Sequence, residues 1–166
     1  MLFDLKHFFD TGKRPYESRL TVDLSARDFS GAVIPQPVKA QFTACPVAEG
    51  VVVALKAEAE VHGDCALCLD PVRRIYAVDA EWTVRERDLA DPDFELPLEE
   101  KGKLNVDEWL FQEFMFQIPT VLVCSAGCQG LCPACGRKKA ACICPKEAQQ
   151  AAPVDARLSI LKSLLN

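Results

Sequence analysis

Eight of the nine cysteines in this chain are clustered at spacings that suit metal binding. The first pair is Cys65-x2-Cys68, and six more cysteines fall between residues 124 and 144. Zinc prefers four thiolate or imidazole ligands in a tetrahedron, and a tight turn between two nearby ligands supplies two of its corners. The spacing therefore predicts thiolate coordination of zinc. The candidate ligands are Cys65, Cys68, Cys124, Cys128, Cys132, Cys135, Cys142 and Cys144.

The cysteines can be grouped in two ways, with one zinc ion or two. In the two-site layout, the pair at 65 and 68 joins Cys124 and Cys128, and the last four cysteines form a local second site. The rival layout has one site, drawn from the six C-terminal cysteines. The two-site layout leaves out Cys45, which we interpret as a small buried residue of a strand.

Other chemistries fit the cysteines less well. A redox Cys-x2-Cys pair opens a helix after a strand, whereas Pro71 and a further strand follow the first pair and a basic loop follows Cys135. An iron–sulfur cluster stays open, because four thiolates alone do not identify the metal. Of the two histidines, His62 lies beside the first pair and is interpreted as a turn residue. A site with four thiolates leaves no open position for a reacting water, so a non-enzymatic protein is expected.

Charge is distributed unevenly along the chain, whose net charge is -5. Residues 86–108 hold nine acidic and three basic side chains, whereas residues 109–166 hold six basic and three acidic ones. Basic residues beside zinc knuckles can contact RNA phosphates, and the same residues also suit a plain solvated loop. The candidate RNA-contacting residues are Arg73, Arg74, Arg137, Lys138 and Lys139.

The elements that must position these residues are predicted from hydrophobic periodicity. Strict alternation predicts strands at 18–24, 38–47, 50–61 and 72–86, which indicates an antiparallel sheet or a small open barrel. The acidic stretch 87–104 reads as a loop with a short extended piece at 94–98. A single central helix is predicted at 105–118, with Asn105 as its N-cap. The fold class is therefore α+β.

Three regions are expected along the chain. Residues 1–123 form a β-rich core domain, residues 124–145 a Cys-rich zinc-binding segment, and residues 146–166 a linker with a short amphipathic C-terminal helix. The N-terminus lacks a basic, apolar leader, and the sequence lacks a long apolar run, so a cytoplasmic protein without membrane contact is expected. Disulfides are disfavoured in that compartment.

The chain resembles the YceD family in four segments. They are Gly63-Asp64-Cys65-Ala66-Leu67-Cys68-Leu69-Asp70-Pro71-Val72; Asp107-Glu108-Trp109 through Ile118-Pro119; Cys124-Ser125-Ala126-Gly127-Cys128-Gln129-Gly130-Leu131-Cys132-Pro133-Ala134-Cys135-Gly136 with Cys142-x1-Cys144; and the ending Asp155-Ala156-Arg157-Leu158. Two positions depart from the family pattern. Leu67 stands where the family usually has arginine, and Ala156 where it tends to have proline.

This resemblance implies a role in accumulation or processing of large-subunit (23S) ribosomal RNA and in ribosome assembly. The expected partner is ribosomal RNA or its precursor, and no small-molecule substrate is expected. The alternative is a zinc-stabilised adaptor that binds a large-subunit ribosomal protein without touching RNA. In that case the acidic stretch 86–108 would meet the basic partner.

Overall fold

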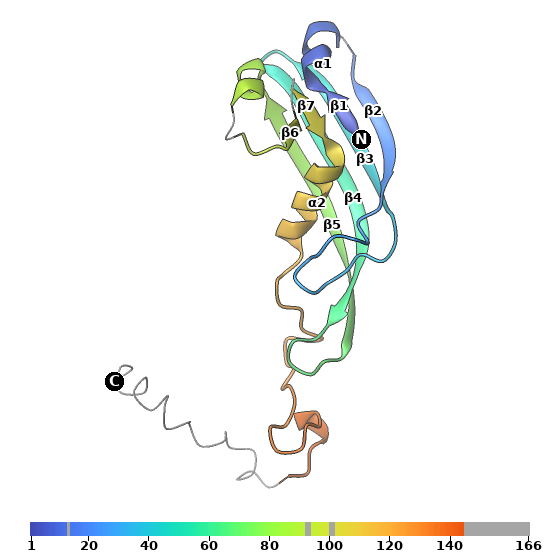
Figure 1. The fold of residues 1–166 in the computed structure, drawn as a ribbon, viewed down its shortest axis with the longest axis vertical. Coiled ribbons are helices and arrows are strands. Elements are labelled where there is room, and N and C mark those ends of the chain that lie inside the picture. Colours follow the sequence, from blue (N-terminus) through green and yellow to red (C-terminus); the bar gives the residue numbers. More distant parts are fainter. Residues whose placement is uncertain (13, 92–93, 100–101, 145–166) are drawn as a thin grey trace, which may run out of the picture.

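The larger of two antiparallel sheets has four strands in the order β2-β3-β4-β5 (Figure 1). This computed structural model describes residues 1–12, 14–91, 94–99 and 102–144. The strands span Tyr16–Val22 (β2), Val38–Val47 (β3), Gly50–Asp64 (β4) and Pro71–Val84 (β5). Alternation along β4 buries Val53, Leu55 and Val61, because successive side chains of a strand point to opposite faces. The predicted antiparallel sheet is thus confirmed.

A smaller sheet has three short strands in the order β1-β7-β6. They span Leu2–Asp4 (β1), Lys103–Asn105 (β7) and Leu98–Glu99 (β6). Helix α1 (Leu5–Thr11) follows β1, and a short 3-10 helix η1 (Glu86–Ala90) follows β5. A second 3-10 turn, η2, spans Lys139–Ala141.

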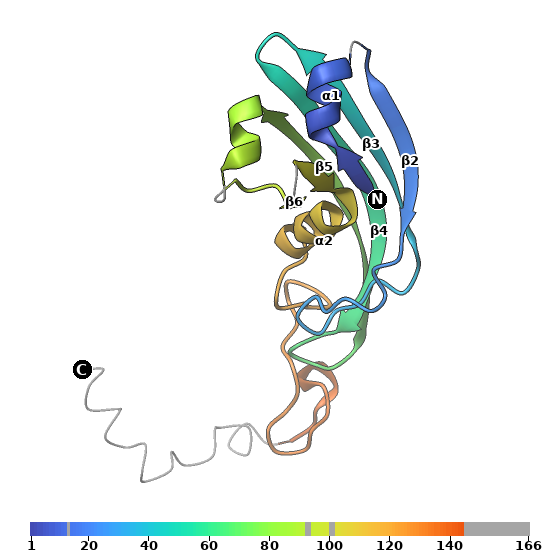
Figure 2. The same ribbon diagram turned by 45° about the horizontal axis from the view of Figure 1, so that its top comes forward.

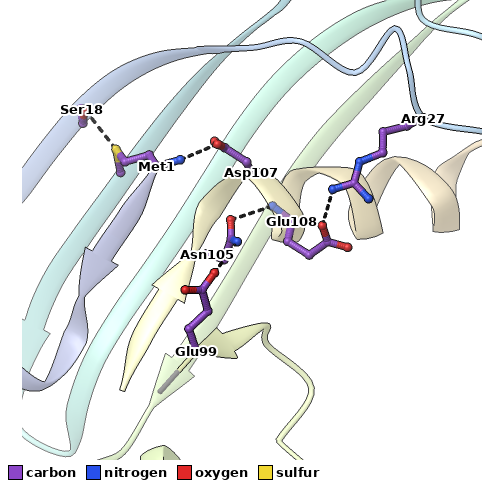
Figure 3. Close-up of polar contacts among 7 residues, drawn as sticks. All are labelled: Met1, Ser18, Arg27, Glu99, Asn105, Asp107 and Glu108. Carbon is purple, nitrogen blue, oxygen red and sulfur yellow. Dashed lines mark hydrogen bonds and ion pairs between the residues drawn. The ribbon is translucent and has the colours of Figure 1, made fainter. Parts of the chain in front are cut away.

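Helix α2 (Val106–Gln117) lies against one face of the larger sheet (Figure 2). The Asn105 side chain caps it by accepting a hydrogen bond from the Glu108 amide at 3.2 Å. Its first turn carries two carboxylates, where the helix dipole is positive. Asp107 pairs with the Met1 amino group, and Glu108 pairs with Arg27 at 2.6 Å (Figure 3). The helix start therefore ties together the N-terminus and the loop after β2.

Two separate groups of buried side chains stabilise the fold. The main core lies between α2 and the sheet, and includes Trp109, Phe114, Phe42 and Leu55. A small second group surrounds the first cysteine pair at the tip of the β4–β5 hairpin. That tip extends past α2 and meets the Cys-rich segment (Figure 1). The molecule is elongated as a result, with the cysteines at one end.

The structure differs from the sequence-based expectation in two places. Besides the predicted central helix, the described residues include a second α-helix, α1, which begins at Leu5 and was not expected. The acidic stretch expected to be a loop holds η1, β6 and β7. Of the two arrangements expected for the strands, the structure has the antiparallel sheet, since both sheets are open within the part of the chain described here. The predicted linker and C-terminal helix lie outside the described residues. No helix among the described residues is long and apolar enough to cross a membrane.

Candidate metal centre

The first cysteine cluster joins two segments that are far apart in sequence. Cys65 and Cys68 lie on the turn between β4 and β5, and Cys124 and Cys128 follow α2. The sulfur of Cys65 lies 3.8 Å from that of Cys128, and the sulfur of Cys68 lies 3.6 Å from that of Cys124. Nearby, the Ala66 amide donates to the Leu122 carbonyl at 2.8 Å. The cluster therefore fastens the hairpin tip to the chain that leaves the helix.

Backbone amides point at the sulfurs of this cluster. The Cys124 amide is the largest influence on Cys65, and with the amides of Cys68 and Leu67 it lowers the pKa of this thiol to about 6 against the effect of burial. At Cys68 the Asp70 amide acts in the lowering direction, but burial and three neighbouring thiols outweigh it and raise the pKa to about 12. Cys65 and Cys68 thus differ in how readily they hold negative charge, and a bound cation would stabilise both thiolates.

The second cluster is local and contains Cys132, Cys135, Cys142 and Cys144. The sulfurs of Cys135 and Cys142 are 3.5 Å apart. The Cys135 amide, followed by the Ala134 amide, lowers the pKa of Cys132 to about 7. Hydrogen bonds with Cys142 and Cys135 raise the pKa of Cys144 to about 12. The same division of charge among thiols recurs here.

The two Cys-x2-Cys turns have the same backbone hydrogen bonds. In the first, the Cys65 amide donates to the carbonyl of Asp70 and the Leu69 amide donates to the carbonyl of Cys65, both at 2.8 Å. In the second, the Cys132 amide donates to the Arg137 carbonyl at 2.6 Å and the Gly136 amide donates to the Cys132 carbonyl at 2.8 Å. Each turn is therefore a knuckle that presents two sulfurs on one side.

The sulfur geometry fits one tetrahedral ion in each cluster. Within each group of four, all sulfurs lie within 4.8 Å of one another. Zn–S bonds of about 2.3 Å place the corners of a tetrahedron about 3.8 Å apart, close to the 3.5–3.8 Å separations found here. A disulfide would need sulfurs about 2 Å apart, and all nine cysteines are free. Both clusters can hold a metal ion, and the donors suit a soft or borderline one.

The second cluster is attached to the first through Leu131 and Lys138. The Leu131 amide donates to the Leu67 carbonyl at 3.1 Å, and the Leu131 side chain packs against the buried group around Cys65. Lys138 forms an ion pair with Asp70, which lowers the pKa of Asp70 and raises that of Lys138. No local sequence pattern indicates this ion pair, because its partners are separated by 68 residues.

The candidate RNA-contacting residues all lie at the cysteine end, but two of them already have partners. Arg74 donates to the Val123 carbonyl at 2.6 Å, and Lys138 binds Asp70. Arg73, Arg137 and Lys139 are exposed.

His62 of β4 lies opposite Arg73 of β5, and its ring is paired with Glu60 at 3.0 Å. Cys45 is partly buried in β3, opposite Val52.

Comparison with known proteins identifies the family. No curated protein sequence and no solved structure is significantly similar to this chain. The family described as "Large ribosomal RNA subunit accumulation protein YceD" matches residues 53–165. This match includes both cysteine clusters, α2 and the strands β4 and β5 for almost their whole length. The chain therefore belongs to the YceD family.

Proposed function

We propose that this protein is a non-enzymatic zinc-binding factor that promotes accumulation and processing of large-subunit (23S) ribosomal RNA during ribosome assembly. The family match over residues 53–165 is the observation that carries the proposal. The cysteine geometry supports the non-enzymatic part. Each cluster provides four thiolates to one ion, which leaves no open position for a substrate or a reacting water. The metal's role would then be structural.

Zinc is the proposed ion, with one in each cluster. An iron–sulfur cluster divides its four thiolates between two or more iron atoms, which places thiolates on different irons farther apart than the 4.8 Å within which all four sulfurs of each cluster lie here. Elemental analysis of protein purified under reducing conditions tests this proposal. The expected result is about two equivalents of zinc, one for each four-thiolate cluster. One equivalent would contradict the two-site layout, and iron in place of zinc would contradict the choice of metal.

Direct RNA contact is proposed for Arg73, Arg137 and Lys139. Four thiolates around one divalent zinc leave about two excess negative charges per site, so some nearby cations serve to offset the thiolates. Lys138 is one of these, because Cys68 and Cys124 contribute to raising its pKa after the larger effect of Asp70. Arg74 is held by Val123. The three remaining candidates are exposed, and this supports the proposal that they contact phosphates.

The test replaces these three residues with alanine together. The matched control removes three exposed cations away from the cysteine end, Arg14, Arg19 and Lys39. We expect the first variant to keep its zinc and its fold but to bind a 23S precursor fragment more weakly. Its log–log salt slope should fall by up to about 0.9 for each duplex phosphate that the variant no longer neutralises. In a strain that depends on the protein, the ratio of large- to small-subunit ribosomal RNA should also fall. The control should change neither property by as much.

The adaptor function replaces this proposal under one outcome. If RNA binding and RNA levels are unchanged in the triple variant while a large-subunit ribosomal protein still co-purifies through residues 86–108, the protein acts without direct RNA contact. The zinc clusters would then stabilise the cysteine end of the molecule, away from that protein interface.

A further inference from the structure

A groove lies at the end of the molecule opposite the cysteines. Its walls come from α1, η1, the segment 94–99 and the turn before β7, and its volume is about 640 Å³. Figure 1 places α1 and η1 at one end of the long axis and the Cys-rich segment at the other. A groove of this size holds one or two large side chains of a ligand. It is therefore a separate feature from the candidate metal centre.

The groove combines an apolar floor with an acidic rim. Phe9, Leu89 and Phe94 are partly buried and pack against the main core from this side. Four carboxylates line the rim, and Lys6 is the one basic side chain among its described lining residues. The carboxylates belong to Asp10, Glu86, Asp91 and Glu99, and all four residues are exposed.

The carboxylates are spread around the groove and do not converge on a point. Asp10 lies on α1, Glu86 and Asp91 lie at the two ends of η1, and Glu99 lies on β6. A metal ion needs three or more ligand atoms close together. Among the described residues, such groups within 4.8 Å consist of cysteines alone. Separated negative charges around an apolar floor instead match a chain that carries several cations and an apolar anchor.

We propose that this groove binds a lysine- or arginine-rich peptide segment of a protein partner, with one apolar side chain seated on Phe9 and Leu89. Charge complementarity selects this occupant over RNA, because the rim would repel phosphates. The inference rests on the same acidic stretch as the adaptor alternative and gives it a defined site and ligand class, and it does not require direct RNA contact. If both hold, the molecule has an RNA-contacting end and a cationic-peptide-binding end.

The test measures binding of a synthetic peptide to the zinc-loaded full-length protein by fluorescence anisotropy. The probe is a short labelled peptide in which lysines flank one central leucine. Two control peptides replace the lysines with glutamate or the leucine with glycine. We expect saturable, salt-sensitive binding of the lysine–leucine peptide and weaker binding of both controls, because one control loses the charge and the other loses the anchor.

Two pairs of variants locate the binding site. Asp10→Asn combined with Glu86→Gln removes two of the four negative charges of the rim. Glu58→Gln combined with Glu81→Gln removes the same charge from exposed positions of β4 and β5. Ala90→Arg places a bulky cation on the groove wall, and Ala77→Arg does so on β5. We expect the groove variants to weaken peptide binding by about 3- to 10-fold, given the usual size of exposed charge interactions. The control variants should bind like the parent, and all variants should keep the parent's RNA affinity.

Several results would overturn the proposal. The first is absence of saturable binding by the lysine–leucine peptide. The second is binding of the glycine-containing peptide as tight as that of the leucine-containing one. The third is an equal loss of peptide affinity in the groove variants and the control variants. A loss of RNA affinity in the groove variants would show that the two ends are not separate sites. Failure of RNA binding in the parent protein, with peptide binding intact, would instead count against the RNA-contact proposal alone.

Discussion

The residue after each Cys-x2-Cys pair decides how easily the knuckle turn forms. Both residues have a left-handed backbone, with φ of 60° at Leu69 and 69° at Gly136. Glycine adopts this conformation freely, whereas for a residue with a Cβ it costs about 1 kcal/mol or more. Leu69 is 66% exposed, so packing offsets little of this cost. The first knuckle therefore forms at a higher conformational cost than the second.

The two positions should respond to substitution in opposite directions. Leu69→Gly should relieve the left-handed strain and strengthen metal binding at the first cluster, while Gly136→Ala should weaken the second by about 1 kcal/mol, or about fivefold. A Cβ at position 136 would have no atom within 4 Å apart from those of the adjoining residues. The effect of Gly136→Ala is therefore conformational and not steric. Titration with a chelator would measure the metal affinity of each cluster. Hydrogen exchange of the Cys65 amide would report on the first knuckle, and that of the Cys132 amide on the second. Equal responses at both sites would contradict this explanation.

Among the elements, α2 is capped at its N-terminus by one side chain, that of Asn105. The Asn105 side-chain oxygen accepts a hydrogen bond from the Glu108 amide, and its side-chain nitrogen donates one to Glu99 at 2.7 Å (Figure 3). It therefore caps the helix and links it to β6 at the same time. Asparagine suits both tasks because its amide has an acceptor and a donor.

Substitution of Asn105 can separate these two tasks. Asn105→Ala should lower the free energy of unfolding by about 1 kcal/mol through loss of the cap. Asn105→Asp keeps a capping acceptor but places a carboxylate beside Glu99, so it should also destabilise the protein. Adding Glu99→Gln should restore stability to the aspartate variant and leave the alanine variant unchanged. Urea unfolding would measure all four variants, and absence of rescue would show that repulsion from Glu99 does not cause the loss in the aspartate variant.

The two clusters should depend on each other unequally. The second cluster is attached to the first by the Leu131 hydrogen bond and the Lys138–Asp70 ion pair. The first cluster is held by the β4–β5 hairpin and by the chain after α2. Cys132→Ser with Cys135→Ser should therefore release one metal and leave the Cys65 amide protected. Cys65→Ser with Cys68→Ser should release its own metal and also speed exchange at Leu131. Hydrogen exchange checks both variants, and faster exchange throughout the sheet in the first would contradict this order.

Much of the fold and the candidate ligands followed from local sequence patterns. Alternation predicted β3 and β4, and capping with an apolar stripe predicted α2. Spacing left two layouts open for the cysteines, and the structure brings together the two groups of the two-site layout. Strand β1 was missed because its three residues pair with β7, about a hundred residues later. The Lys138–Asp70 pair was missed for the same reason, since no local pattern encodes a contact between distant side chains.

At the scale of the whole molecule, the body and the cysteine end have separate buried cores. Strands β4 and β5 connect them, as Figure 1 shows. The core of the body contains large aromatic side chains, whereas the buried group at the cysteine end consists of cysteines and small aliphatic residues. Metal coordination is therefore expected to supply most of the folding energy at the cysteine end, while hydrophobic burial stabilises the body.

Metal removal should consequently unfold one end of the molecule and leave the other folded. Trp109 is buried in the body, where it donates to Glu113 at 2.9 Å, and Trp82 is half-buried on β5 within the body. Tryptophan emission therefore reports on the body alone. We expect a strong chelator, added under reducing conditions, to leave the emission maximum unchanged at room temperature. Amide exchange at Cys65, Leu131 and Cys132 should rise at the same chelator concentration, because their hydrogen bonds belong to the knuckles and the joint between them. Restoring zinc should reverse the change. A red shift of tryptophan emission that tracks metal loss would mean that the clusters stabilise the body as well, and the two ends would then unfold as one cooperative unit.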